Sequence, residues 1–206
     1  MIIKQIKSKF FRGLFGQNTY AILNKKSAVI IDAGANIEDL IFEIGNRKVQ
    51  AVLVTHLHFD HIYYIERILK EFNCPVYIQK GFDEKFYDAN KNVSLNLRQN
   101  LTFNVQENQI KYYEDELEFD GLKFKIYKTP GHSADGVCIK IDEFLFTGDT
   151  IFDDSIGRFD FYDSDFNQLK NSLKIIGDID FEVAYPGHGE ACSKDQILNT
   201  ISFYID

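Results

Sequence analysis

Three histidines and one aspartate lie within six consecutive residues, in the segment His56-Leu57-His58-Phe59-Asp60-His61. The segment directly follows the apolar run Val49–Val54, which has the length and composition of a buried strand. If the chain leaves that strand extended, the first two histidines point to one place, and the aspartate and third histidine point to a neighbouring place. Imidazole and carboxylate are common protein ligands of zinc and iron. Four ligands exceed what one tetrahedral site can take from a short loop, so the segment predicts two adjacent metal ions.

The other two histidines of the chain also follow apolar runs, and a Pro-Gly pair precedes each of them. His132 comes after the run Leu122–Tyr127, and His188 comes after the run Phe181–Tyr185. A Pro-Gly turn bends the chain at the end of a strand, so that the next side chain projects from the strand end. All five histidines are therefore predicted to lie at strand ends, where their side chains could converge on a metal centre.

Two aspartates follow apolar runs in the same way. Asp149 comes after Phe144–Phe146 in a Thr-Gly-Asp-Thr segment that would, by itself, be an ordinary turn. In the company of the histidines, it is predicted to be the carboxylate that bridges the two ions. Asp32 comes after Val29–Ile31, and two interpretations stay open for it. It either orients a metal-bound histidine or is simply an aspartate at the end of a strand.

Composition excludes several classes of partner. The formal net charge of −8 gives no long-range attraction to nucleic-acid phosphates or to anionic lipids, so we expect neither nucleic acid nor membrane as a partner. The apolar runs are too short to cross a bilayer. The three cysteines (Cys74, Cys138 and Cys192) leave one thiol unpaired in any disulfide scheme and form no C-x-x-C pair. A reduced, cytoplasmic setting is therefore expected.

The N-terminus is basic and apolar, and it allows two interpretations. No acidic residue precedes Asp32, and Lys4, Lys7, Lys9 and Arg12 alternate with isoleucine and phenylalanine. This pattern occurs in amphipathic transit segments. However, the stretch contains only one serine and continues without a break into an apolar strand pattern, so we predict a first strand or hairpin.

The rest of the chain predicts a layered α/β arrangement, because helical patterns lie between the strand-length runs. Asn36 caps a helical pattern over 37–44, a second pattern begins near Ile62, and Ser193 and Gln196 have capping-box spacing at the start of a short C-terminal helix. A further helical pattern runs over 166–176 with Ser164 as its predicted cap. The segment Gly81–Asp120 is polar and rich in asparagine, and we predict loops with short helices there. No linker divides the chain, so residues 1–206 are expected to form a single domain.

These motifs resemble the metallo-β-lactamase superfamily over nearly the whole chain. Within it, Asn92-Val93-Ser94 and Gly157-Arg158-Phe159-Asp160 resemble the glyoxalase II-like, or hydroxyacylglutathione hydrolase-like, branch. The resemblance implies an αββα sandwich with the metals at one edge. It also implies that His56, His58 and His132 bind one ion, that Asp60, His61 and His188 bind the other, and that Asp149 bridges them.

The chain departs from the larger glyoxalase II enzymes after the last histidine. Those enzymes continue into a C-terminal helical domain with glutathione contacts, whereas 18 residues follow His188 here. We therefore expect a short form in which recognition of glutathione is weak. Arg158 is the one guanidinium near the motifs. It either grips a substrate carboxylate or forms an ion pair with an aspartate such as Asp160.

The expected activity is hydrolysis of small thioesters by a metal-bound hydroxide. Two divalent ions are expected, zinc first, with iron or manganese as alternatives, and Asp60 is predicted to be catalytic by accepting the proton of the attacking water. Two other activities stay open on the resemblance: a mononuclear-iron persulfide dioxygenase, and another hydrolase such as a lactonase or phosphodiesterase. A binding or scaffold role would not require a full ligand set. The sequence carries no signal for an oligomeric state.

Overall fold

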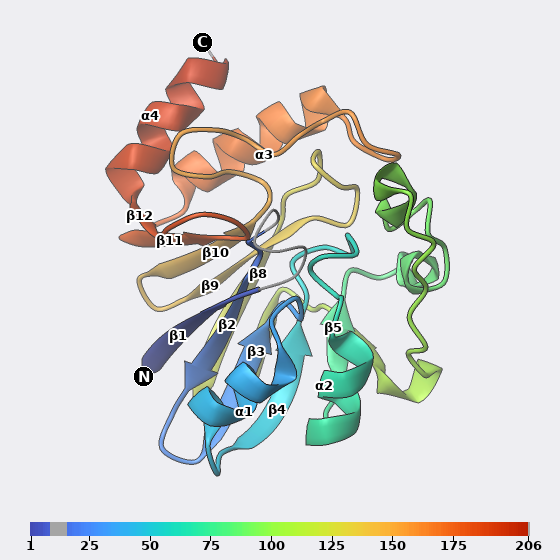
Figure 1. The fold of residues 1–206 in the computed structure, drawn as a ribbon. Coiled ribbons are helices and arrows are strands. Elements are labelled where there is room, and N and C mark those ends of the chain that lie inside the picture. The colour runs from blue at the N-terminus through green and yellow to red at the C-terminus, as the bar shows by residue number, and fades with distance from the viewer. Residues whose placement is uncertain (9–15, 206) are drawn as a thin grey trace.

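The apolar runs form two six-stranded sheets that pack face to face in the computed structural model, which describes residues 1–8 and 16–205 (Figure 1). The first sheet has the order β1-β2-β3-β4-β5-β6, and the second has the order β12-β11-β10-β9-β8-β7. The first contains β1 (Ile2–Lys7), β2 (Asn18–Leu23), β3 (Ser27–Ile31), β4 (Lys48–Leu53), β5 (Val76–Ile78) and β6 (Ile110–Tyr112). The second contains β7 (Glu116–Phe119), β8 (Leu122–Lys128), β9 (Val137–Ile141), β10 (Phe144–Gly148), β11 (Val183–Pro186) and β12 (Cys192–Ser193).

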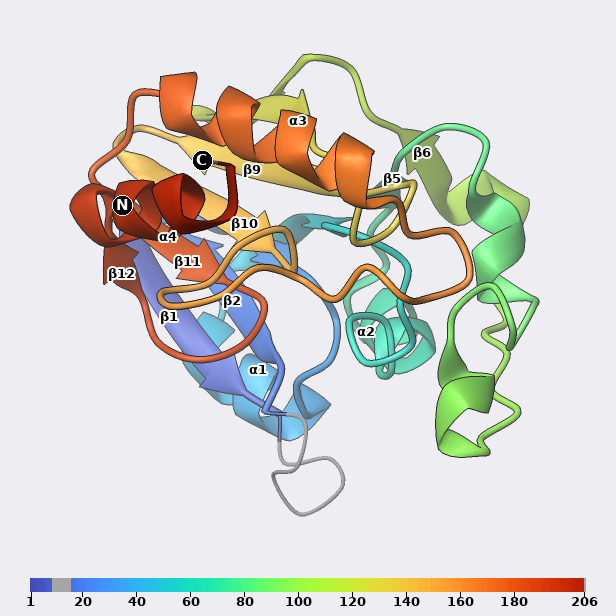
Figure 2. The ribbon, with the colours of Figure 1, turned by 90° about the horizontal axis from the view of Figure 1, so that it is seen from above.

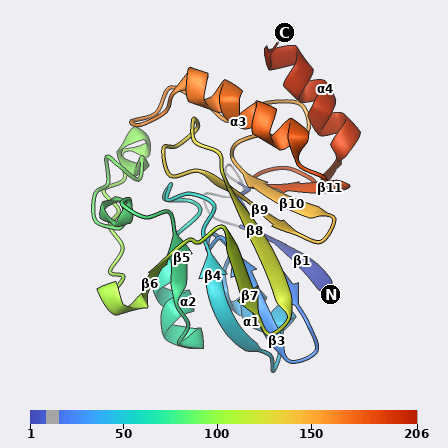
Figure 3. The ribbon, with the colours of Figure 1, turned by 180° about the vertical axis from the view of Figure 1, so that it is seen from behind.

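Two helices cover the outer face of each sheet. The helices α1 (Ile37–Ile44) and α2 (Ile65–Phe72) lie on the first sheet, and α3 (Phe166–Asp178) and α4 (Lys194–Ile205) lie on the second (Figures 2 and 3). Central strands such as β3 and β9 are buried on both faces, which explains their nearly continuous apolar runs, whereas β7 and β8 expose alternate residues. The predicted αββα architecture is confirmed.

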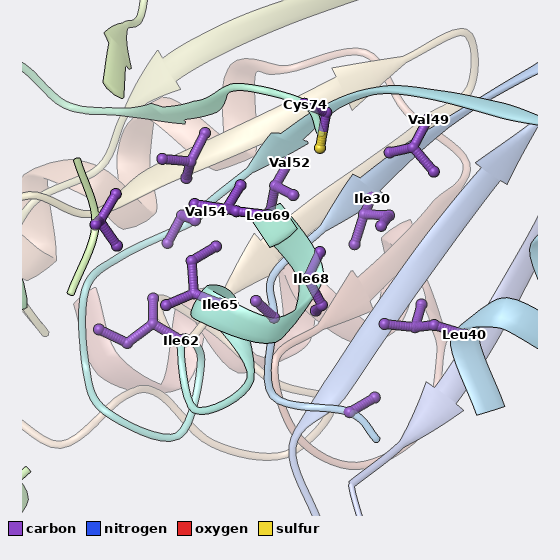
Figure 4. Close-up of a cluster of buried hydrophobic side chains, with 14 of the residues drawn as sticks. Ile30, Leu40, Val49, Val52, Val54, Ile62, Ile65, Ile68, Leu69 and Cys74 are labelled. Atoms are coloured by element: carbon purple, nitrogen blue, oxygen red, sulfur yellow. The ribbon is translucent and has the colours of Figure 1, made fainter. Parts of the chain in front are cut away.

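Alternate residues of the central strands enter different apolar layers. In β3, Ile30 faces the helices, where it joins a cluster with Val52, Ile65 and Leu69 (Figure 4). Its neighbour Ile31 faces the second sheet and joins the apolar layer between the two sheets. A third cluster lies between the second sheet and the pair α3 and α4. Burial of about 25 cal/mol per Å² of apolar surface in these layers holds the strand ends in fixed positions.

Strand direction brings several strand ends to one edge. In the first sheet, β3 runs parallel to β4, so both end at the same edge. In the second sheet, β10 runs parallel to β11, and β8 has the same direction because both β8 and β10 pair antiparallel with β9. Every residue predicted to bind metal follows the end of β4, β8, β10 or β11.

Several element boundaries differ from the sequence prediction. The helix α2 begins at Ile65, not near Ile62, because residues 62–64 continue the turns of the ligand segment that precedes them. The helix α3 is capped by Asp165, whose carboxylate accepts the Gln168 amide N–H. Ser164, the predicted cap, instead donates its hydroxyl to the His132 carbonyl oxygen at 2.9 Å. The helix α4 has 12 residues, longer than the short helix expected, and its capping box is present.

The segment predicted as loops with short helices also contributes strands. It contains the 3₁₀ helices η2 (Asp83–Phe86), η3 (Ser94–Leu97) and η4 (Glu107–Gln109), as expected. The two short strands β6 and β7, of three and four residues, were not predicted, because runs this short acquire their pairing only from neighbouring strands.

At the N-terminus, β1 confirms the predicted first strand, and it pairs antiparallel with β2. Lys9 and Arg12, which belong to the same basic stretch, lie outside the described residues. None of the helices found in the described part of the chain is long and apolar enough to span a membrane.

Candidate metal centre

The structure brings all seven predicted ligands together at the edge where the strands end. Their ligand atoms form three overlapping sets of three, and within each set the atoms lie within 4.8 Å of one another. The sets are His56, His58 and His132; His56, His61 and Asp149; and Asp60, His61 and His188. We call the first set the buried group and the third set the outer group.

The buried group is almost entirely shielded from solvent. His56 and His58 are each 2% exposed, and His132 is 5% exposed. His132 Nε2 lies 3.0 Å from His58 Nδ1. On the other side of its ring, His132 donates Nδ1–H to the Arg158 carbonyl oxygen at 2.8 Å. This bond places the proton on Nδ1, so the Nε2 lone pair faces the site.

The outer group is held by carboxylates. His61 is fully buried, and its Nδ1 lies 2.8 Å from Asp32 Oδ2. Asp60 Oδ2 lies 3.2 Å from His188 Nε2. The His188 side chain is 28% exposed and that of Asp60 is 14% exposed, so this group faces solvent on one side.

Asp149 lies between the two groups, as predicted for a bridging carboxylate. Its Oδ1 is 3.2 Å from His61 Nε2. Its Oδ2 is 3.4 Å from His188 Nε2 and 3.6 Å from His132 Nε2. Oδ2 therefore lies near histidines of both groups, and Oδ1 adds a contact to the outer group.

Asp32 orients the outer group from behind. It is 1% exposed, and its backbone has φ 61°, a left-handed conformation that aspartate tolerates better than most residues. One of its oxygens accepts the Thr55 amide N–H at 2.7 Å, and the Thr55 hydroxyl lies within 3.0 Å of both. The other oxygen contacts His61. Of the two interpretations of Asp32, the contacts match the one in which it orients a histidine of the site.

Burial and charge act on the two groups in opposite directions. Burial lowers the pKa of His56, His58 and His132, so these imidazoles are neutral near pH 7 and their lone pairs are available. Burial also acts to lower the pKa of His61 and His188, but the carboxylates beside them outweigh it. The pKa of His61 is raised well above its ordinary value, and that of His188 is raised to about 10. The raised pKa values mean that the carboxylates favour a positive charge in the outer group, and a metal cation would supply one.

The donor set fits a metal ion. Within the described part of the chain, His56 Nε2 and His58 Nε2 are buried and have no hydrogen-bond partner, and the buried His61 Nε2 and Asp149 Oδ1 face each other at 3.2 Å without forming a hydrogen bond. Buried polar atoms are nearly always paired, so four unpaired ligand atoms in one place need a common explanation. Nitrogen and carboxylate donors at this density are what zinc or iron would satisfy.

The loop of His188 depends on a glycine and on a clamp from β2. A Cβ at position 187 would lie 2.2 Å from Asp149 Oδ1 and 2.6 Å from His61 Cε1, so Gly187 lets the backbone approach the site. Asn18 donates its amide to the carbonyl oxygens of Pro186 and Gly189, each at 3.0 Å. Asn18 is not among the site residues predicted from the sequence. Its only sequence signal is its position at the start of β2.

A cavity of about 580 Å³ opens onto the site. The Phe161 ring forms part of its wall and contacts the rings of His58 and His132, with centroids 5.3 and 5.6 Å apart. Arg158 lies over Phe161, 4.4 Å from the ring centroid. Its guanidinium bonds to both Asp160 oxygens at 2.9 and 2.8 Å, so the structure shows the ion-pair alternative for Arg158. Both side chains are exposed.

Comparison with known proteins agrees with this fold. A family model described as the metallo-beta-lactamase superfamily matches residues 12–188. A probable metallo-hydrolase of Streptococcus pyogenes is 31% identical over 207 residues, which cover 95% of this chain and 89% of that protein. A hydroxyacylglutathione hydrolase of Francisella philomiragia is 28% identical over 188 residues, covering 89% of this chain and 67% of that protein. The crystal structure of the BLEG-1 B3 metallo-beta-lactamase has a TM-score of 0.88 and 30% identity, with full coverage of both chains. The chain belongs to the metallo-β-lactamase superfamily.

Proposed function

We propose that this chain is a metal-dependent hydrolase of small thioesters that uses two divalent ions. The buried group would hold one ion, the outer group would hold the other, and Asp149 would contact both. The observation that carries the proposal is the position of Asp149, whose Oδ2 lies 3.4 Å from His188 of the outer group and 3.6 Å from His132 of the buried group. Zinc suits the nitrogen-rich buried group, and iron or manganese would also suit the carboxylates.

The protein groups around the cavity have separable tasks in this reaction. Two divalent ions, when bound, would acidify a water molecule and polarise the substrate carbonyl. Asp60 lines the cavity, and its Oδ2 would accept the proton that the attacking water releases. His188, 3.2 Å away, keeps that oxygen in place. The Phe161 ring covers His58 and His132 and keeps bulk water from that side.

The cysteines do not compete as nucleophiles. All three are buried and free. Burial raises the pKa of Cys74 to about 12 and the pKa of Cys138 and Cys192 to about 11, so the reactive thiolate is scarce near pH 7. Free thiols also suit a reducing compartment, and we include the cytoplasm in the proposal.

Thioesters are favoured by the leaving group. A thiolate leaves without strong acid assistance, and all five histidines already lie in the two ligand groups, so none is left as a separate acid. The similarity to the hydroxyacylglutathione hydrolase of Francisella philomiragia supports an acyl thioester, although the similarity to the BLEG-1 enzyme makes a β-lactam the natural competitor.

The test combines elemental analysis with a substrate panel. Purified full-length protein reconstituted with Zn²⁺, Fe²⁺ or Mn²⁺ is assayed on acyl thioesters, a chromogenic β-lactam and a phosphodiester. We expect two ions per chain and the highest kcat/KM on thioesters. Preference for the β-lactam or the phosphodiester would overturn the substrate class. One iron per chain with oxygen uptake on a persulfide would replace hydrolysis by dioxygenase chemistry.

A second comparison tests the thiol half of the substrate. Arg158 is the only arginine or lysine that lines the cavity among the described residues, and it is already paired. We therefore propose that glutathione is weakly recognised. Lactoyl-glutathione and the same acyl group on a truncated thiol should differ in kcat/KM by less than about a hundredfold, or roughly 2.7 kcal/mol of transition-state binding. A larger advantage for glutathione would show a dedicated subsite.

A further inference from the structure

A buried lysine lies in the irregular segment that separates, along the sequence, the loop of His56 and His58 from the turn of His132. Lys85 belongs to η2 and is 2% exposed. Its ammonium group donates to Ser133 Oγ at 2.6 Å and to Asp135 Oδ1 at 2.6 Å, and it lies 2.7 Å from Asp163 Oδ2. A buried ammonium is costly to desolvate, so three short contacts of this kind are a specific arrangement.

Two of these three partners lead directly to the buried group. Asp135 uses its other oxygen, Oδ2, to accept the Leu57 amide N–H at 2.7 Å, and Leu57 lies between His56 and His58 in the chain. Ser133 follows His132 in the chain and also donates its hydroxyl to Asp135. The loops that carry the three ligands of the buried group are thus joined through one ammonium group.

The third partner leads to the wall of the cavity. Asp163 precedes Ser164, whose hydroxyl donates to the His132 carbonyl oxygen and accepts the Phe161 amide N–H at 3.0 Å. The segment around Lys85 is itself tied to the site. The Lys85 carbonyl oxygen accepts the Asn92 side-chain amide at 3.2 Å, and the Asn92 carbonyl oxygen accepts the Phe59 amide N–H. In Figures 1 and 3, this green segment borders the loop that precedes α3.

The bonds of the ammonium group are distributed unequally between the two ligand groups. Each described hydrogen-bond or ion-pair partner of Lys85 Nζ acts on the loop of His56 and His58, or on the turn of His132. The outer-group histidines have different supports. His61 contacts Asp32, and the His188 loop is held by Asn18 from β2. A change at Lys85 should therefore reach one half of the centre first.

We propose that Lys85 is a positioning residue that sets the geometry of the buried group and so the affinity of that group for its ion. The inference rests on the proposed two-ion site but concerns a residue that binds no metal. Residues that orient metal ligands through hydrogen bonds commonly contribute about 10- to 100-fold to metal affinity. The effect expected here has that size and is confined to one ion.

The experiment titrates full-length protein, stripped of metal with a chelator, with Co²⁺ while the visible absorption of bound cobalt is followed. Wild-type protein should bind two ions in separable steps. We assign the tighter step to the buried group, whose imidazoles are almost fully shielded from solvent. In Lys85→Met, the affinity of this step should fall about 10- to 100-fold and its absorption bands should shift, whereas the weaker step changes by less than about threefold. The control is Lys91→Met, which removes an ammonium from the same segment, where it pairs with Glu84 near the surface. It should leave both steps unchanged.

The proposal is overturned if Lys85→Met leaves the tighter step unchanged or weakens both steps equally. Because this variant leaves two carboxylates without their cation, it carries a risk of misfolding. Ser133→Ala removes only the hydroxyl link and keeps the Lys85–Asp135 pair, so it serves as the second variant. It should weaken the tighter step by about threefold or more with the same band shift, and unchanged binding would also overturn the proposal. Failure of wild-type protein to bind any Co²⁺ would instead count against the proposed function.

Discussion

The two halves of the metal centre are built in different ways. The buried group consists of imidazoles alone, each 5% exposed or less, and it is anchored by backbone groups and by the Lys85 cluster of Lys85, Ser133, Asp135 and Asp163. The outer group mixes imidazole with carboxylate, and the His188 side chain reaches 28% exposure. The first half is a buried set of neutral imidazoles, and the second is a charged set that is partly open to solvent.

The difference has a consequence for metal binding. A neutral, preorganised nitrogen cage loses little entropy when it binds an ion, so the buried group should hold its ion more tightly. The outer group attracts cations through Asp60 and Asp149, but solvent competes for its open side. In the proposed two-ion site, metal loss should therefore occur in two steps, with the outer ion leaving first. The following substitutions test that order.

The largest effect is expected for Asp149→Ala, because this residue contacts both halves. A carboxylate between two cations offsets their repulsion, so its loss should lower the metal content below two ions per chain. It should also lower kcat/KM by more than about a hundredfold, beyond the range for residues that only orient a ligand. Elemental analysis and steady-state kinetics measure both quantities.

The control for Asp149→Ala is Asp154→Ala, an exposed aspartate a few residues further along the chain. It should change neither metal content nor rate. If Asp149→Ala kept both ions and lost only turnover, the carboxylate would not bridge the halves.

The second effect separates the halves directly. His188→Ala should release the outer ion and leave the buried ion bound with nearly wild-type affinity. His58→Ala should instead weaken the tighter ion, because it removes one of three ligands from the neutral cage. Competition with a chromogenic chelator resolves the two steps. Loss of both ions in His188→Ala would show that the halves fill as one unit and would remove the proposed order.

A smaller and selective effect is expected for Asp32→Asn. Asparagine tolerates the φ of 61° and can still accept the Thr55 amide N–H with one oxygen. Its amide nitrogen would then face His61 Nδ1, where a carboxylate oxygen now lies at 2.8 Å. We expect about a 10- to 100-fold loss of affinity for the outer ion and no change for the buried ion. Equal weakening of both steps would mean that Asp32 supports the strand end as a whole.

Local sequence patterns predict the candidate metal ligands but not the residues that support them. All seven candidate ligands and their convergence follow from local signals, since each lies in a loop that follows an apolar run, and two follow Pro-Gly turns. Their supports do not follow from local signals. Lys85 meets Asp135 across 50 residues of sequence, and it lies in a segment without helical or strand periodicity. A lone lysine in such a segment is predicted to be solvated.

Boundaries show the limit of local reasoning as well. Ser164 and Asp165 are both good helix caps, and the sequence alone favours neither strongly. Asp165 caps α3 in the structure, because the Ser164 hydroxyl donates instead to the His132 carbonyl oxygen. The strands β6 and β7 are absent from the prediction for a related reason. Their pairing with β5 and β8 depends on neighbours that only the folded chain supplies.

The smallest effect is expected for Arg158, whose exposed side chain lines the cavity. Because its guanidinium is already paired with Asp160 and both side chains are exposed, Arg158→Gln should leave Tm and metal content unchanged. A substrate carboxylate would have to compete with Asp160, so KM for an anionic thioester should rise only about threefold, with KM for a neutral one unchanged. Asp160→Asn frees the guanidinium and should lower KM for the anionic thioester by a similar factor. If both variants change KM for anionic and neutral thioesters alike, Arg158 shapes the wall through its contact with Phe161 and does not recognise charge.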